Sequence, residues 1–115
     1  MRGHERWIVD AFAEWLSNAG WAVRREVDFV DLLAERDGER MYVEAKARTA
    51  AIGTDVDTMY GQILRRMPIA DDAAARFAVV VPAEARSAAV PARLRQMLRI
   101  DVYVVDERGT VARCD

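Results

Sequence analysis

The fold is decided by residues 29–46, which read FVDLLAERDGERMYVEAK. Near the middle of this stretch, Asp37-Gly38 is a strong signal for a two-residue β-hairpin loop. Such a loop fixes the pairing of the two strands, so that the numbers of paired residues add up to 75. This register predicts that Asp31 lies directly opposite Glu44.

Side-chain alternation divides the predicted hairpin into two faces. One face is apolar throughout and is predicted to be core; it consists of Val30, Leu32, Ala34, Met41, Val43 and Ala45. The other face carries Asp31, Glu44 and Lys46 among apolar neighbours. Directly opposed carboxylates repel each other, and a divalent cation would reverse the sign of that interaction. Mg²⁺ accepts one or two carboxylates at about 2.0–2.1 Å and keeps its other positions for water and substrate phosphate.

Lys46 is the only lysine among 17 cationic residues. An ammonium is a compact charge that a guanidinium does not replace, so this position invites a chemical role, such as stabilising a phosphorane or orienting a water. A second interpretation stays open. It is a solvated hairpin face on which Lys46 forms a weak surface pair with Glu44 or Asp31.

Helices and strands are predicted on both sides of the hairpin. Residues 4–19 have the periodicity of a helix that Gly20 ends, and further helices are expected at about 54–66 and at 91–98. Strands are expected at 21–26, 27–36, 40–48, 77–81 and 101–106, with a short final strand after Gly109. The predicted core stripes are Ile8, Ala11, Phe12, Trp15, Leu16 and Ala19 in the first helix and Val56, Tyr60, Ile63, Leu64 and Met67 in the second. The order αβββαβαβ(β) predicts an α/β fold, with a central mixed sheet flanked by helices.

Length and composition exclude several classes of protein. With 115 residues and 52% apolar residues, the chain is expected to form a single domain over 1–115. It has no apolar run long enough to span a membrane and no apolar signal core, so we expect a soluble cytoplasmic protein. Cys114 is the one cysteine, which excludes an intramolecular disulfide and a cysteine-built metal site. The net charge of −2 means that nucleic-acid binding would need a local basic patch.

Asp31 followed by Glu44-Ala45-Lys46 resembles the D…(D/E)-X-K signature of the PD-(D/E)XK nuclease superfamily. The elements over residues 3–106 are similar to its restriction-endonuclease-like αβββαβ core, closest to the Mrr-like and Holliday-junction-resolvase-like branches. The resemblance implies that Asp31, Glu44 and the main-chain carbonyl of Ala45 hold Mg²⁺, with Mn²⁺ as a substitute. It also implies that Lys46 stabilises the transition state or positions the attacking water.

Further positions match the superfamily less specifically. Glu5, on the first helix, matches a helix glutamate that supplements the metal site, although an acid in the first helical turn is also favoured by the helix dipole. Gln62 is similar to a glutamine that several branches direct at the active site, although an exposed helix glutamine is the ordinary interpretation. Arginines expected to contact phosphates are Arg24, Arg25, Arg40, Arg48, Arg65 and Arg66. Trp7, Trp15 and Trp21 are interpreted as core or interface residues.

The leading hypothesis is a metal-dependent nuclease, most simply an endodeoxyribonuclease that hydrolyses DNA phosphodiester bonds. The alternative is a non-catalytic module of the same fold that binds nucleic acid or a partner protein. A purely structural α/β subunit is a weaker third hypothesis. A domain of this size offers little surface for gripping a duplex, so a homodimer is expected, and a separate targeting subunit is left open.

Overall fold

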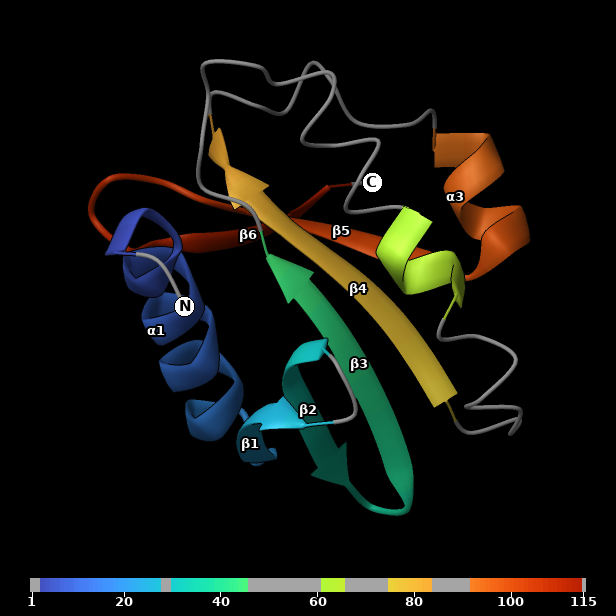
Figure 1. Cartoon of the computed structure of the whole chain (residues 1–115), viewed down its shortest axis with the longest axis horizontal. Coiled ribbons are helices and arrows are strands. Elements are labelled where there is room, and N and C mark those ends of the chain that lie inside the picture. The colour runs from blue at the N-terminus through green and yellow to red at the C-terminus, as the bar shows by residue number, and fades with distance from the viewer. Residues whose placement is uncertain (1–2, 28–29, 46–60, 66–74, 84–91, 115) are drawn as a thin grey trace.

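The computed structural model describes residues 3–27, 30–45, 61–65, 75–83 and 92–114. Its centre is a six-stranded sheet in the order β1-β2-β3-β4-β5-β6 (Figure 1). The strands are β1 (Ala22–Val27), β2 (Val30–Arg36), β3 (Glu39–Ala45), β4 (Ala75–Pro82), β5 (Ile100–Val105) and β6 (Val111–Cys114). The helices are α1 (Gly3–Asn18) and α3 (Ala92–Leu98), and residues 61–65 are also helical.

The sheet is mixed. β1, β2 and β3 are antiparallel, β4 is parallel to both β3 and β5, and β6 is antiparallel to β5. Helix α1 packs on one face, whereas α3 and the helical segment 61–65 pack on the other (Figure 1). The predicted α/β fold with a mixed sheet flanked by helices is therefore confirmed.

Gly20 ends α1 as the sequence predicts. The amide of Trp21 donates to the Leu16 carbonyl at 3.0 Å, and the amide of Gly20 donates to the Ser17 carbonyl at 3.1 Å. This pair of bonds, with Gly20 at a φ of 94°, is a Schellman motif. Trp21 and Leu16 lie in the same core cluster, which is the apolar contact that accompanies this motif.

The core-facing side of α1 differs in part from the predicted stripe. Phe12 and its apolar neighbours are buried as expected, but Trp15 is 39% exposed. Trp15 lies at the edge of the stripe, where only part of its ring is covered, by Phe12 and Tyr103. Val9 and Ala13 take part in the core instead. Of the other two tryptophans, Trp21 is core and Trp7 is 40% exposed, while Ala19 lies just beyond the helix and is exposed.

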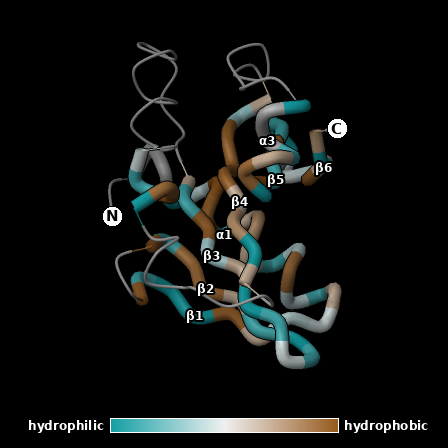
Figure 2. Tube along the Cα trace, turned by 90° about the vertical axis from the view of Figure 1, so that its right-hand side faces the viewer, coloured by the Kyte–Doolittle hydropathy of each residue, from teal (hydrophilic) through white to brown (hydrophobic). Residues whose placement is uncertain are grey.

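The opposite face of the sheet is also buried. Ile63, from the helical segment, is fully buried in a cluster with residues of β2 to β5, and Leu98 of α3 packs against it. Leu64 was expected in the same core stripe but is 40% exposed, because it lies on the side of the helical segment that faces away from the sheet. Val79 and Val80 of β4 lie in opposite clusters, which confirms the prediction of a strand buried on both faces. Hydrophobic stretches accordingly follow the central strands (Figure 2).

Two further observations concern expectations from composition. Cys114 lies in β6 and is half-buried against the second cluster, whereas Asp115 lies outside the described residues. Neither α1 nor any other helix in the described ranges has the length and apolarity needed to span a membrane.

Candidate functional site

The hairpin of β2 and β3 has the register that its loop predicts. Leu32 pairs with Val43, and the paired numbers add up to 75 throughout. Asp37 and Gly38 have φ values of 51° and 82°, the left-handed conformations that a two-residue type I′ turn requires. The paired ladder ends at Leu32 and Val43, one residue short of Asp31 and Glu44. That these two carboxylates face each other directly therefore stays a prediction.

Glu44 is buried, and the residues beside it in the sheet are apolar. It is 5% exposed, and it is the one polar or charged side chain that the described part of the chain buries. On β4 its register partner is Val79, which belongs to the apolar cluster with Tyr42 and Ile63. Glu44 is therefore not on a solvated face, as the alternative supposed, while a pair with Lys46 lies outside the described residues. Burying an ionised carboxylate is costly unless it is paired, hydrogen-bonded or bound to a metal.

Asp31 is half-buried and is oriented by the neighbouring strand. The main-chain amide of Ala45 donates a hydrogen bond to Asp31 Oδ2 at 2.8 Å. This contact holds the Asp31 carboxylate against the end of β3, beside the peptide that joins Glu44 to Ala45. The structure therefore brings together three of the predicted metal-site residues.

The start of β2 is less regular than alternation predicts. Val30 was expected on the α1 face but belongs to the cluster on the opposite face. In β1, Glu26 is the residue level with Asp31 in the register, and its φ is 52°. A left-handed residue inside a strand interrupts the pleat, so strict alternation does not hold at this end of the sheet. No feature of the sequence indicates this conformation of Glu26.

Several predicted site residues are not brought to the site by the described structure. Lys46, Arg48 and Arg66 lie outside the described residues, as does the side chain of Glu5. Gln62 is exposed, on the helical segment that packs over the same face of the sheet as Glu44. Its role, like those of Glu5 and Lys46, stays a prediction.

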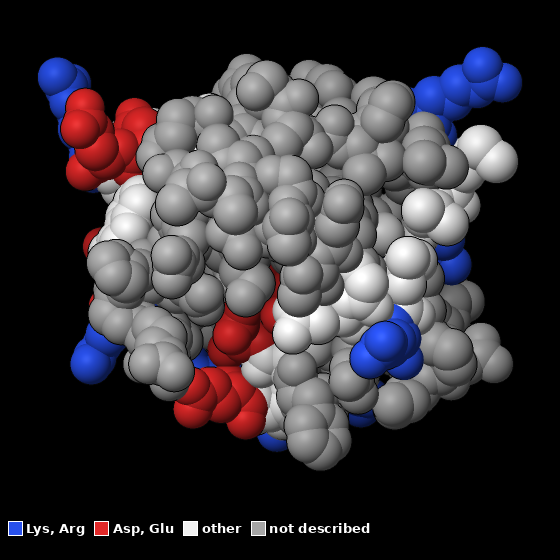
Figure 3. Space-filling view, turned by 45° about the horizontal axis from the view of Figure 1, so that its top comes forward, with Lys and Arg blue, Asp and Glu red and all other residues white. Residues whose placement is uncertain are grey.

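The arginines that were expected to contact phosphates lie in ion pairs. Arg24 and Arg40 approach Glu35 at 2.7 Å and 3.6 Å, and Arg25 approaches Asp10 at 2.5 Å. Arg65 is exposed. In the space-filling view, basic side chains of the described residues are scattered rather than gathered in one broad patch (Figure 3).

The donors at the site suit a hard cation. Two carboxylates and a main-chain carbonyl offer only oxygen, which Mg²⁺ and Mn²⁺ prefer. Within the described ranges, no group of three or more histidine, cysteine, aspartate or glutamate side chains is arranged to hold a metal. A metal bound by the described residues would therefore rest on Asp31 and Glu44 together with main-chain oxygen and water.

Comparison with known proteins shows the fold alone. No protein-family model and no curated protein matches the sequence. A XisH family protein from Nostoc punctiforme is similar in structure, with a TM-score of 0.67 and 19% identity over 95% of this chain and 99% of that chain. An fdxN element excision controlling factor protein from Anabaena variabilis has a TM-score of 0.66 and 18% identity over 96% and 99% of the two chains. A protein of unknown function has a TM-score of 0.50 and 15% identity over 84% of this chain and 56% of that one.

The two structural neighbours with TM-scores of 0.67 and 0.66 cover nearly the whole of this chain. The shared arrangement, a mixed sheet flanked by helices, is consistent with the restriction-endonuclease-like fold that the sequence resembles. Identities below 20% do not carry residue roles from those proteins to this one. The candidate site therefore stands on its own geometry.

Proposed function

We propose that this chain is a metal-dependent nuclease that hydrolyses phosphodiester bonds, most simply in DNA. The burial of Glu44 carries the proposal, because a carboxylate that is 5% exposed among apolar side chains is costly to keep there, and such buried ionisable groups gather at functional sites. Asp31, whose carboxylate is held by the amide of Ala45, the residue that follows Glu44, would bring a second negative charge close by. Two carboxylates held near each other are explained if a cation binds between them.

In this proposal Asp31, Glu44 and the main-chain carbonyl of Ala45 hold Mg²⁺. When bound, the metal would lower the pKa of a coordinated water and neutralise charge on the phosphate. The Ala45 amide, 2.8 Å from Asp31 Oδ2, keeps the aspartate carboxylate oriented. The apolar surroundings of Glu44 lower the local dielectric constant, so that each charge there acts more strongly than in water.

The remaining residues complete the proposed site by their resemblance to the superfamily. Lys46, which follows Ala45 directly, would stabilise charge on the phosphorane or position the attacking water. Glu5 would supplement the metal site and Gln62 would contribute from the helical segment. We also propose that the protein acts as a homodimer, because one domain of 115 residues offers little surface for a duplex.

A second candidate function is a non-catalytic module of the same fold that binds nucleic acid or a partner protein. One structural neighbour is named as a factor controlling the excision of an element, which is also compatible with a module that assists another enzyme.

A plasmid-nicking assay with Mg²⁺ distinguishes the two functions. The wild-type protein is expected to convert supercoiled plasmid to open circles, and Asp31→Asn and Glu44→Gln are each expected to slow nicking by about a hundredfold or more. Lys46→Ala is expected to lose nicking while it keeps metal binding. Asp37→Asn is the matched control, because Asn-Gly suits the same turn and the position is remote from the site. Nicking that survives in both carboxylate variants, or is absent from the wild type, would contradict the nuclease.

A further inference from the structure

Two arginines converge on one carboxylate on the open part of the hairpin. Arg24 Nη2 lies 2.7 Å from Glu35 Oε1, and Arg40 Nε lies 3.6 Å from Glu35 Oε2. Each oxygen of Glu35 thus faces a different guanidinium, and the three residues come from three adjacent strands, β1, β2 and β3. We call this cluster, Arg24–Glu35–Arg40, the arginine clamp.

The arginine clamp lies on the same face of the sheet as the candidate site. Arg24 pairs with Leu33, which belongs to the apolar cluster on the side of Glu44. A strand rises about 3.3 Å per residue. Arg24 therefore lies about 7 Å along β1 from Glu26, the residue level with Asp31, and Arg40 lies about 13 Å along β3 from Glu44. A distance of about 13 Å corresponds to about four nucleotides at the rise of one strand of duplex DNA.

We propose that the arginine clamp binds a backbone phosphate of the nucleic acid, about four nucleotides or fewer from the phosphate at Asp31 and Glu44. Its position relative to a reacting phosphate rests on the proposed function. In the free protein, Glu35 occupies the place of that phosphate. Guanidinium groups bind carboxylates and phosphates through the same planar set of donors.

Exchange of Glu35 for a phosphate is physically easy. The side chain of Glu35 is 40% exposed and those of Arg24 and Arg40 are 57% and 52% exposed. Exposed ion pairs contribute little to stability, so the carboxylate can leave at small cost. A phosphate diester backbone brings many charges at once and releases counterions when arginines bind it, which a single carboxylate does not.

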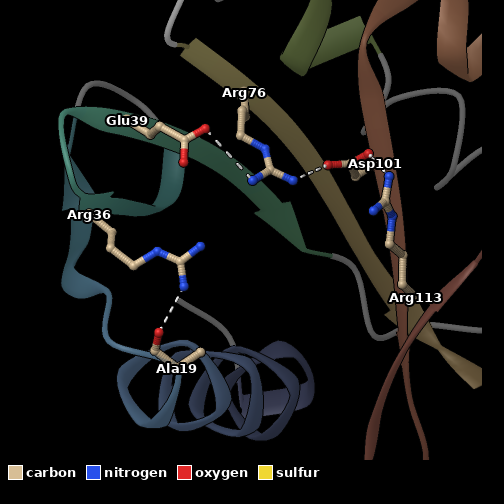
Figure 4. Close-up of polar contacts among 6 residues, drawn as sticks. All are labelled: Ala19, Arg36, Glu39, Arg76, Asp101 and Arg113. Carbon is tan, nitrogen blue, oxygen red and sulfur yellow. Dashed lines mark hydrogen bonds and ion pairs between the residues drawn. The ribbon is translucent and has the colours of Figure 1, made fainter.

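A similar cluster on the opposite face provides the control. Arg76 and Arg113 approach the two oxygens of Asp101 at 3.1 Å and 2.8 Å (Figure 4). Asp101 is only 19% exposed, and it lies on the face that α1 covers, away from Glu44. Loss of an arginine here changes the net charge by the same amount as loss of one from the arginine clamp.

Fluorescence anisotropy with a short labelled DNA duplex, in EDTA and at several salt concentrations, tests the proposal. Arg24→Gln and Arg40→Gln are each expected to reduce the slope of log Kobs against log salt by about 0.9. If wild type and variant bind equally at 1 M salt, this difference in slope makes the variant bind about eightfold more weakly than wild type at 0.1 M salt. Glu35→Gln is expected to bind more tightly, because the competing carboxylate is gone. Arg113→Gln is expected to bind like the wild type.

The outcomes separate the arginine clamp from the nuclease. If Arg24→Gln and Arg40→Gln match Arg113→Gln, if Glu35→Gln binds no tighter than wild type, or if the wild type binds no duplex, the arginine clamp is refuted. This assay contains no metal and does not depend on cleavage. The expected slopes without any nicking would uphold the clamp for a non-catalytic module and overturn the nuclease.

Discussion

The hydrogen bond from Ala45 to Asp31 allows the structural and chemical roles of this aspartate to be separated. Asp31→Ala removes the acceptor of a 2.8 Å bond in a partly buried place, which costs about 1–3 kcal/mol. The effect expected for Asp31→Ala, without metal, is therefore a loss of about 1–3 kcal/mol. For a chain of this length, that loss lowers the melting temperature by about 4–12 °C.

Asp31→Asn is the matched variant, because asparagine keeps an oxygen acceptor at the same place and removes the charge. Its stability without metal is expected to lie within about 0.5 kcal/mol of wild type. Urea unfolding followed by tryptophan fluorescence, in EDTA, measures both variants. Equal stability of Asp31→Ala and wild type, or equal losses in the two variants, would refute the reasoning.

Two other predictions concern the fold. Gly20→Ala is expected to lower the free energy of unfolding by about 1–2 kcal/mol, because Gly20 has a φ of 94° that a residue with a side chain rarely adopts. A clash is not the cause, since the added Cβ would meet Arg36 at an ordinary 3.7 Å. Unchanged stability in thermal unfolding would show that the backbone there tolerates a side chain. Burial, and then the charge of Asp101, raise the pKa of Tyr103 above the ordinary 10.0. The unfolded chain therefore loses this proton first, and stability falls as the pH rises from about 10 through the folded-state pKa. Urea unfolding at pH 9 and pH 11 should show a larger loss for wild type than for Tyr103→Phe, and equal losses would contradict the raised pKa.

The hairpin shows what sequence determines well. A two-residue loop at Asp37-Gly38 leaves one register for the flanking strands, so the pairing from Arg36 and Glu39 to Leu32 and Val43 follows from local chemistry alone. The helix stop at Gly20 is equally local, because its left-handed φ and the two Schellman hydrogen bonds involve only neighbouring residues.

Other features depend on contacts between distant segments, and the sequence does not determine them. The exposure of Trp15 and Leu64 depends on which side of each helix is covered by other segments of the chain. The burial of Glu44 requires the apolar cluster around Ile63 to cover that face, which alternation in the hairpin does not reveal. The bond from the Ala45 amide to Asp31 has no signal either, because every residue but proline carries that donor.

Isothermal titration calorimetry with Mg²⁺ tests the central claim most directly, using wild type, Glu44→Gln and the control Asp37→Asn. The account predicts that wild type and Asp37→Asn bind the metal and that Glu44→Gln does not. A thermal melt should agree, with a gain of about 2.7 kcal/mol for the binding-competent proteins at a hundred times the dissociation constant. Absence of binding by the wild type, or binding by Glu44→Gln equal to that of Asp37→Asn, would contradict a metal site at Asp31 and Glu44.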